Sequence, residues 1–146
     1  MEALPTVQSL ISDRFFLGGA TDVRGFRYRG IGPRAGQDAL GGDVYCAAGV
    51  HLHAPLPFAK WQRAVGNAVT THVFGTCGSV VEQVDVASLP QLPGRLYGAL
   101  AASVGAGVVI NAGAFKMEVN VVCPVRWTAA DQPVRGLQFG AGVQFL

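Results

Sequence analysis

The side chains best suited to chemistry in this sequence are two neighbouring histidines and a few carboxylates. His51 and His53 are two residues apart, so on a β-strand both imidazoles point to one face, as they would in a metal site. No third ligand follows at a metal-site spacing, and two polar side chains that face water are the favoured interpretation. Glu82 and Asp85 have no evident partner base, and the GxSxG, HExxH and P-loop motifs are absent. We therefore predict a protein that is not an enzyme and that binds no metal or other cofactor.

A second group of candidates is a basic and aromatic loop. It contains Arg24, Phe26, Arg27, Tyr28, Arg29 and Arg34. Such a loop can bind nucleic acid, but no wider basic face accompanies it, and the net charge is only +2. The same residues are better explained by a loop that packs in the polar, water-filled interior of a β-barrel. Nucleic acid is therefore not an expected partner.

The composition points to a membrane without spanning helices. Charged residues make up 14% of the 146 residues, against about 25% in soluble domains. No stretch reaches the roughly 18 uninterrupted apolar residues of a membrane helix. A closed β-sheet is the other structure that satisfies every backbone polar group in a bilayer. The amino terminus lacks the features of a secretory or matrix-targeting signal, so we expect an internal or carboxy-terminal address. A soluble ligand-binding β-barrel is the alternative, but so few charges would hardly solvate its exterior.

The elements that must position these residues are strands, because apolar residues recur with a period of two. This alternation occurs at 43–54, 65–73, 103–110, 115–121 and 136–146, with the end of a further strand at 15–17. Lys116 and Glu118 occupy the polar face of one segment and must therefore face water. The connections alternate between long and short, as in membrane barrels, and at most a short helix is expected near 95–102. About five strands are fewer than the eight or so that a barrel needs, so this chain does not close by itself.

Two stretches of the sequence resemble a known family. The first is FFLGGATDVRGFRYRGIGPR at residues 15–34, followed by DALGGD at 38–43. It resembles the core barrel of the mitochondrial sorting and assembly machinery, in the bacterial surface antigen superfamily that includes the bacterial Bam insertase. In that superfamily the loop folds back into the lumen and is anchored by a Val-Arg-Gly-Phe motif, here Val23, Arg24, Gly25 and Phe26. The second stretch is similar to the sorting signal of outer-membrane barrels, with Gln138, Gly140, Val143 and Phe145 at its motif positions.

The resemblance also implies a partner strand for the loop. In the family an Asp or Asn commonly faces the loop arginine, within a pattern of aromatic, any, Asp or Asn, any, Gly. Phe74, Thr76 and Gly78 fit this pattern, except that Thr76 replaces the carboxylate or amide. Arg24 would be costly against lipid, but in a lumen its forked donors can reach a polar partner.

Fold, location and function follow from the resemblance as expectations. The chain is expected to be an all-β, antiparallel transmembrane β-barrel segment, the carboxy-terminal portion of one domain over 1–146. Residues 19–42 form the lumen loop and 43–146 the last five strands. The family inserts client β-barrel precursors into the mitochondrial outer membrane, in which it is integral, and opens a seam between its first and last strands. Expected partners are the lipid bilayer, client precursors and other subunits of the sorting and assembly complex. A truncated or passive structural barrel paralogue without insertase activity and a bacterial outer-membrane assembly relative are the alternatives.

Overall fold

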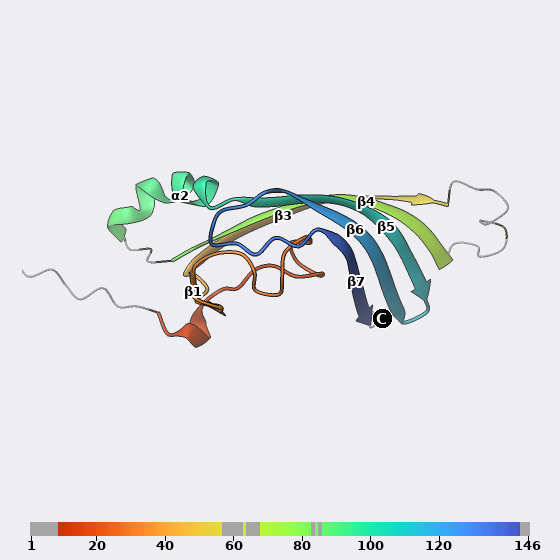
Figure 1. The fold of residues 1–146 in the computed structure, drawn as a ribbon, viewed down its shortest axis with the longest axis horizontal. Coiled ribbons are helices and arrows are strands. Elements are labelled where there is room, and N and C mark those ends of the chain that lie inside the picture. Colours follow the sequence, from red (N-terminus) through yellow and green to blue (C-terminus); the bar gives the residue numbers. More distant parts are fainter. Residues whose placement is uncertain (1–8, 57–62, 64–67, 83, 85, 144–146) are drawn as a thin grey trace, which may run out of the picture.

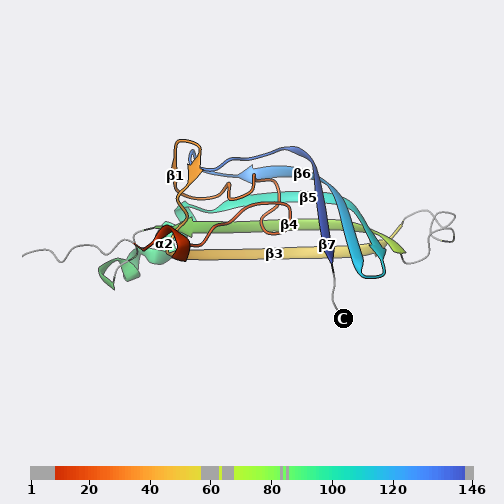
Figure 2. The ribbon, with the colours of Figure 1, turned by 90° about the horizontal axis from the view of Figure 1, so that it is seen from below.

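The chain folds into one five-stranded antiparallel sheet (Figures 1 and 2). The structure is a computed structural model that describes residues 9–56, 63, 68–82, 84 and 86–143. The strands pair in chain order: β3 (Val44–Pro55), β4 (Val69–Val81), β5 (Ala101–Ala112), β6 (Phe115–Arg126) and β7 (Gly136–Val143). Because β3 and β7 are edge strands, the sheet is open. The predicted antiparallel all-β fold, with about five strands that do not close, is confirmed.

Short elements accompany the sheet. They are a 3-10 helix at Ile11–Asp13, the small β1 (Arg34–Ala35) and β2 (Asp38–Ala39) hairpin, a second 3-10 helix at Val86–Gln91, and α2 (Leu92–Gly98). None of the helices within the described residues is long and apolar enough to cross a membrane. The short helix expected near 95–102 is present but begins and ends earlier.

Two sequence expectations about the strands are corrected. The second strand, expected at 65–73, runs from Val69 to Val81; residues 65–67 lie outside the described part. Its second half shows no clear alternation, because Gly75 stands on the otherwise apolar outer face and Gly78 on the inner face. A Cβ on Gly78 would overlap Leu17 Cδ2, so only glycine lets the chain pack on it. Residues 15–17 do not end a strand: Phe15 and Leu17 form single bridges to Gly42 and Ile31 instead.

The two faces of the sheet differ sharply in chemistry. The outer face carries large exposed apolar side chains: Val50, Leu52, Val73, Val104, Phe115, Met117, Val121, Leu137, Phe139 and Val143. Residues 14–42 lie against the concave inner face (Figure 1). A small core forms between them and the sheet, from Leu17, Val23, Phe26, Ile31, Val80 and Ala101. The assignment of the apolar face to lipid therefore agrees with the exposure of each side chain.

Three connections lie at one end of the sheet. The loop that leads into β3, the β4–β5 connection with α2, and residues 127–135 all lie there. The two-residue turn between β5 and β6 lies at the other end, where Gly113 has a φ of 63°. The β3–β4 connection, residues 56–68, joins the same end and lies mostly outside the described residues, so the short turn typical of one end of a membrane barrel is seen only between β5 and β6.

If the outer face contacts lipid, a charged side chain in the middle of β6 should destabilise the protein in a bilayer. Val121 is 60% exposed on the outer face. Val121→Arg should lower the free energy of unfolding from lipid bilayers by about 2–4 kcal/mol, because a charge near the bilayer centre is desolvated. Denaturant unfolding monitored by tryptophan fluorescence measures the change. Val121→Leu, the matched control, should leave stability nearly unchanged, and equal stabilities for the two variants would contradict a lipid-facing wall.

Candidate functional site

The lumen loop, residues 19–42, is held on the inner face by its Val-Arg-Gly-Phe motif. Val23 and Phe26 are 1% and 0% exposed. Gly25 has a φ of 83°, and a Cβ there would lie 2.9 Å from Val122 Cγ1, so the turn excludes other residues both by conformation and by space. The motif thus forms a tight turn pressed into the sheet, with its two large apolar side chains as anchors.

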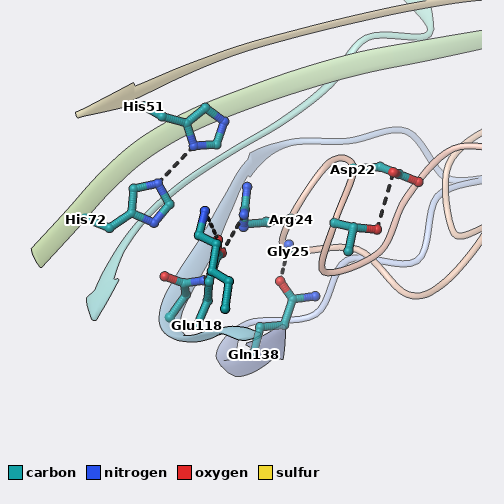
Figure 3. A network of polar contacts seen from close by, with 10 residues as sticks. Asp22, Arg24, Gly25, His51, His72, Glu118 and Gln138 are labelled. Atoms are coloured by element: carbon teal, nitrogen blue, oxygen red, sulfur yellow. Dashed lines mark hydrogen bonds and ion pairs between the residues drawn. The ribbon is translucent and has the colours of Figure 1, made fainter. Parts of the chain in front are cut away.

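Arg24 makes the central polar contact of the site (Figure 3). Its Nη2 lies 2.6 Å from Glu118 Oε2 on β6, and the two side chains are 9% and 10% exposed. Lys116 Nζ lies 3.0 Å from the other carboxylate oxygen of Glu118. The guanidinium carbon of Arg24 also lies 4.9 Å from the centre of the Phe74 ring on β4. The loop arginine is therefore fixed by a buried carboxylate and by an aromatic face.

The predicted partner strand contacts the loop, but not as a charge partner. The charge partner of Arg24 is Glu118 of β6. Thr76 of β4 carries only a hydroxyl group, which cannot balance the charge. Thr76 Oγ1 lies 3.0 Å from Ser103 Oγ, and Ser103 donates to the backbone carbonyl of Arg24. Thr76 thus supports the backbone of the motif through Ser103. Of the other two predicted residues, Phe74 stacks on the guanidinium and Gly78 gives space to Leu17 and Val23.

Glycines on β5 open the path between β4 and β6. A Cβ on Gly105 would overlap Phe74 Cζ, and one on Gly107 would overlap the carbonyl oxygen of Val119. Side chains from the flanking strands therefore reach across β5. The nearly bare inner face of this strand lets Phe74 reach Arg24 of the loop and leaves room for the Asn120 amide over Gly107.

The last strand holds the loop as well. Gly25 N–H donates to Gln138 Oε1 at 3.0 Å, and Gln138 Nε2 donates to the Phe26 carbonyl at 3.4 Å. Gly140 lies beside the loop, since a Cβ there would be 4.0 Å from the carbonyl oxygen of Ala20. Val143 is on the outer face and is 52% exposed. Phe145, the remaining predicted signal residue, lies outside the described residues.

Glu118 and Asp131 are site residues that the sequence did not identify as such. Asp131 is 8% exposed; its Oδ1 accepts from Gly32 N–H at 2.9 Å, and its Oδ2 accepts from Thr128 N–H at 2.6 Å. The 127–135 connection is thereby tied to the lumen loop. For Glu118 the available signal was a carboxylate in mid-strand on the inner face; for Asp131 nothing in the local sequence distinguishes it from a turn residue.

The histidines of the first strand meet a third one. His51 Nδ1 lies 2.9 Å from His72 Nε2 on β4, and His53 stacks on His72 with ring centres 4.4 Å apart. Within the described part of the chain, no group of three or more His, Cys, Asp or Glu side chains is arranged to hold a metal ion.

These features define the class of protein: part of a transmembrane β-barrel with an apolar outer wall, a polar inner wall and a loop docked in its lumen. The Omp85 superfamily domain matches residues 5–145. The chain belongs to the Omp85 superfamily. The resemblance predicted from the two motifs is thus confirmed.

Known relatives agree with this assignment. Sorting and assembly machinery component 50 homolog A of Xenopus laevis is 40% identical over 143 residues, and the human homolog is 39% identical over 140; each match covers 94% of this chain. The sorting assembly machinery 50 kDa subunit of Saccharomyces cerevisiae is 34% identical over 149 residues, and this match covers 100% of the present chain. The chain spans about 30% of the length of these relatives.

A solved structure has the same fold. The crystal structure of BamA from Haemophilus ducreyi lacking POTRA domains 1–3 superposes with a TM-score of 0.68 at 23% identity. The match covers 90% of this chain and 27% of that one. It supports the arrangement of strands as part of a barrel wall.

The ion pair makes a prediction about stability. Glu118→Gln leaves the buried guanidinium of Arg24 without a charged partner, and should cost about 2 kcal/mol or more in the free energy of unfolding. Lys116→Met, the matched control, removes a cation that is 40% exposed and should cost less than about 1 kcal/mol. Denaturant titration in lipid bilayers compares the two. Equal losses would mean that Arg24 does not depend on Glu118.

The glycines of the inner face make a second prediction. Gly107→Ala places a Cβ against the carbonyl oxygen of Val119 and the side chain of Asn120, and should cost about 1–3 kcal/mol through forced displacement. Gly142→Ala is the control, because a Cβ at that position would have no described atom within 4 Å. Thermal unfolding of the two variants checks this, and a tolerated Gly107→Ala would show that the strands do not approach as closely as described.

Proposed function

We propose that this chain forms the carboxy-terminal portion of a barrel that inserts client β-barrel precursors into the mitochondrial outer membrane. The observation that carries the proposal is the pair of hydrogen bonds between Gln138 on the last strand and the lumen loop, one accepted from Gly25 N–H and one donated to the Phe26 carbonyl. They join the two motifs of the family resemblance, the loop anchor and the terminal strand, in one site. The work involves no covalent chemistry, so the chain is not an enzyme.

The edge of β7 supports a part in strand exchange. Within the described residues β7 pairs with β6 on one side only, which leaves a row of backbone donors and acceptors on the other. An extended client segment can add to such an edge by β-augmentation. Leu137 and Phe139 point to the lipid face while Gln138 points inward, so an added strand with the same alternation continues both faces.

The partners follow from the two faces and from the relatives. The outer wall binds the lipid bilayer, in which the protein is integral. Client β-barrel precursors pair with the seam strand. Other subunits of a sorting and assembly complex bind the whole barrel, as the names of the relatives suggest.

A passive barrel paralogue is the second candidate function. Thr76 favours it, because it stands where the family commonly has a carboxylate or amide facing the loop arginine. In this alternative the chain folds with partner strands and keeps the loop docked but inserts no client.

A chimera distinguishes the two functions. The segment of the yeast subunit that matches this chain is replaced by this sequence, and the chimera is expressed in cells depleted of the yeast subunit. Carbonate extraction of mitochondria first establishes that the chimera is integral. We expect assembly of an imported β-barrel precursor to be restored, and Gln138→Leu to slow it by roughly tenfold through loss of two hydrogen bonds to the loop. Gly142→Ala is the matched control in the same strand and should have no effect. An integral chimera that assembles no precursor supports the passive function.

A further inference from the structure

A stack of three histidines lies beside the ion pair, and neither the docking of the loop nor the proposed function has so far given it a role. It consists of His51 and His53 on β3 and His72 on β4. His53 is directly opposite His72 in the strand register, with ring planes 5° apart. The ring of His51 is 5.1 Å from that of His72 and inclined by 11°. His72 is 1% exposed, so its nitrogen atoms need partners within the protein.

The hydrogen bonds of the stack lead towards Glu118. His51 Nδ1 and His72 Nε2 are 2.9 Å apart (Figure 3). On the far side of His72, its Nδ1 is buried without an assigned partner among the described residues, and so is Asn120 Oδ1. His72 and Asn120 flank the same glycine, because Gly107 of β5 is opposite His72 in the β4–β5 register and opposite Asn120 in the β5–β6 register. The amide nitrogen of Asn120 donates to Glu118 Oε2 at 3.3 Å, the same oxygen that binds Arg24.

The direction of each bond follows from the carboxylate. Glu118 accepts only, so Asn120 must present its NH2 group to it and keep Oδ1 for another donor. Across Gly107 from Asn120, His72 Nδ1 is a buried nitrogen without an assigned partner among the described residues, and it can donate to that oxygen when it carries the ring proton. His72 Nε2 is consequently an acceptor, and His51 donates from Nδ1. All the bonds point one way, from β3 across β4 to β6.

We propose that His51, His72 and Asn120 are positioning residues that form a directional hydrogen-bond chain and hold Glu118 in place for the loop arginine. The proton on His72 Nδ1 fixes the orientation of the Asn120 amide. Without it, the amide can flip and turn its oxygen towards the carboxylate, which repels it. Glu118 would then be held by Lys116 and Arg24 alone, and the lumen loop would leave the inner face more often.

This inference extends the proposed function, in which the docked loop belongs to the insertase, but the chain of bonds is a property of the fold. Its test therefore measures loop docking rather than client insertion. If the loop loosens as expected while clients are never inserted, only the proposed function fails.

His53 supplies the matched control. It stacks on His72, as His51 does, and lies two residues along the same strand face, but it has no place in the chain of bonds. His72→Phe keeps an aromatic ring in the stack and removes both nitrogen atoms. His53→Phe keeps the stack and leaves the chain intact.

Loop docking is measured by the reaction of a buried thiol. The three native cysteines are replaced by alanine and Val23, which is 1% exposed in the docked loop, is replaced by cysteine. The full chain is placed in lipid nanodiscs and treated with a water-soluble maleimide. We expect His72→Phe and Asn120→Leu to raise the labelling rate roughly tenfold, as for the loss of one or two buried hydrogen bonds. His53→Phe should change it less than twofold. Equal rates for His72→Phe and His53→Phe would overturn the proposal.

A spectroscopic measurement keeps the proposal testable if a variant does not fold. The chain has only 3 histidines, so ¹⁵N-histidine labelling of the unsubstituted protein gives a spectrum that single substitutions assign. We expect His72 and His51 as neutral imidazoles protonated on Nδ1. A proton on Nε2 of His72 would reverse the required direction and contradict the chain of bonds.

Discussion

The buried ion pair between Arg24 and Glu118 is the interaction on which the inner face depends. A guanidinium that is 9% exposed needs a carboxylate at close range, because burying its charge alone would cost far more than the loop contacts return. Glu118 comes from a strand two positions away from Phe74 in the sheet, so both reach Arg24 only because the strand between them is nearly bare. Gly105 and Gly107 provide that bare strip. Glycines weaken an isolated strand, so their presence in the middle of β5 is explained by the charge pair and the aromatic ring that come together above it.

The sheet and the loop anchor could be predicted from the sequence because both have local signatures. Alternation with a period of two marks the strands wherever one face is apolar and the other polar. Gly25 indicates the turn of the loop anchor, because its positive φ is one that only glycine adopts easily. The inward direction of His51 and His53 also follows from strand parity alone. In each of these cases the residues that decide the structure are neighbours in sequence.

What the sequence did not reveal depends on contacts between distant residues. The partner of Arg24 is 94 residues away, and its identity depends on the register of β6 against β5 and on the depth of the loop. Asp131 is 99 residues from Gly32, whose amide donates to it. The second half of β4 was missed for the same reason: Gly78 reads as a turn residue until Leu17 and Val23 are known to lie on it. A small inward residue marks a strand only in view of what packs against it.

Gln138 shows how one strand can serve the loop and the seam at once. Its side chain projects from the inner face and binds the backbone of Gly25 and Phe26. The donors and acceptors that a client strand would use lie in the plane of the sheet, along the open edge of β7. The two sets of groups are perpendicular and do not compete. An added strand would therefore not need to displace the loop, because the docked loop holds β7 through the side chain of Gln138 and leaves its open edge free. Under the proposed function, the loop is then a brace for the moving seam rather than a plug that must leave before insertion begins.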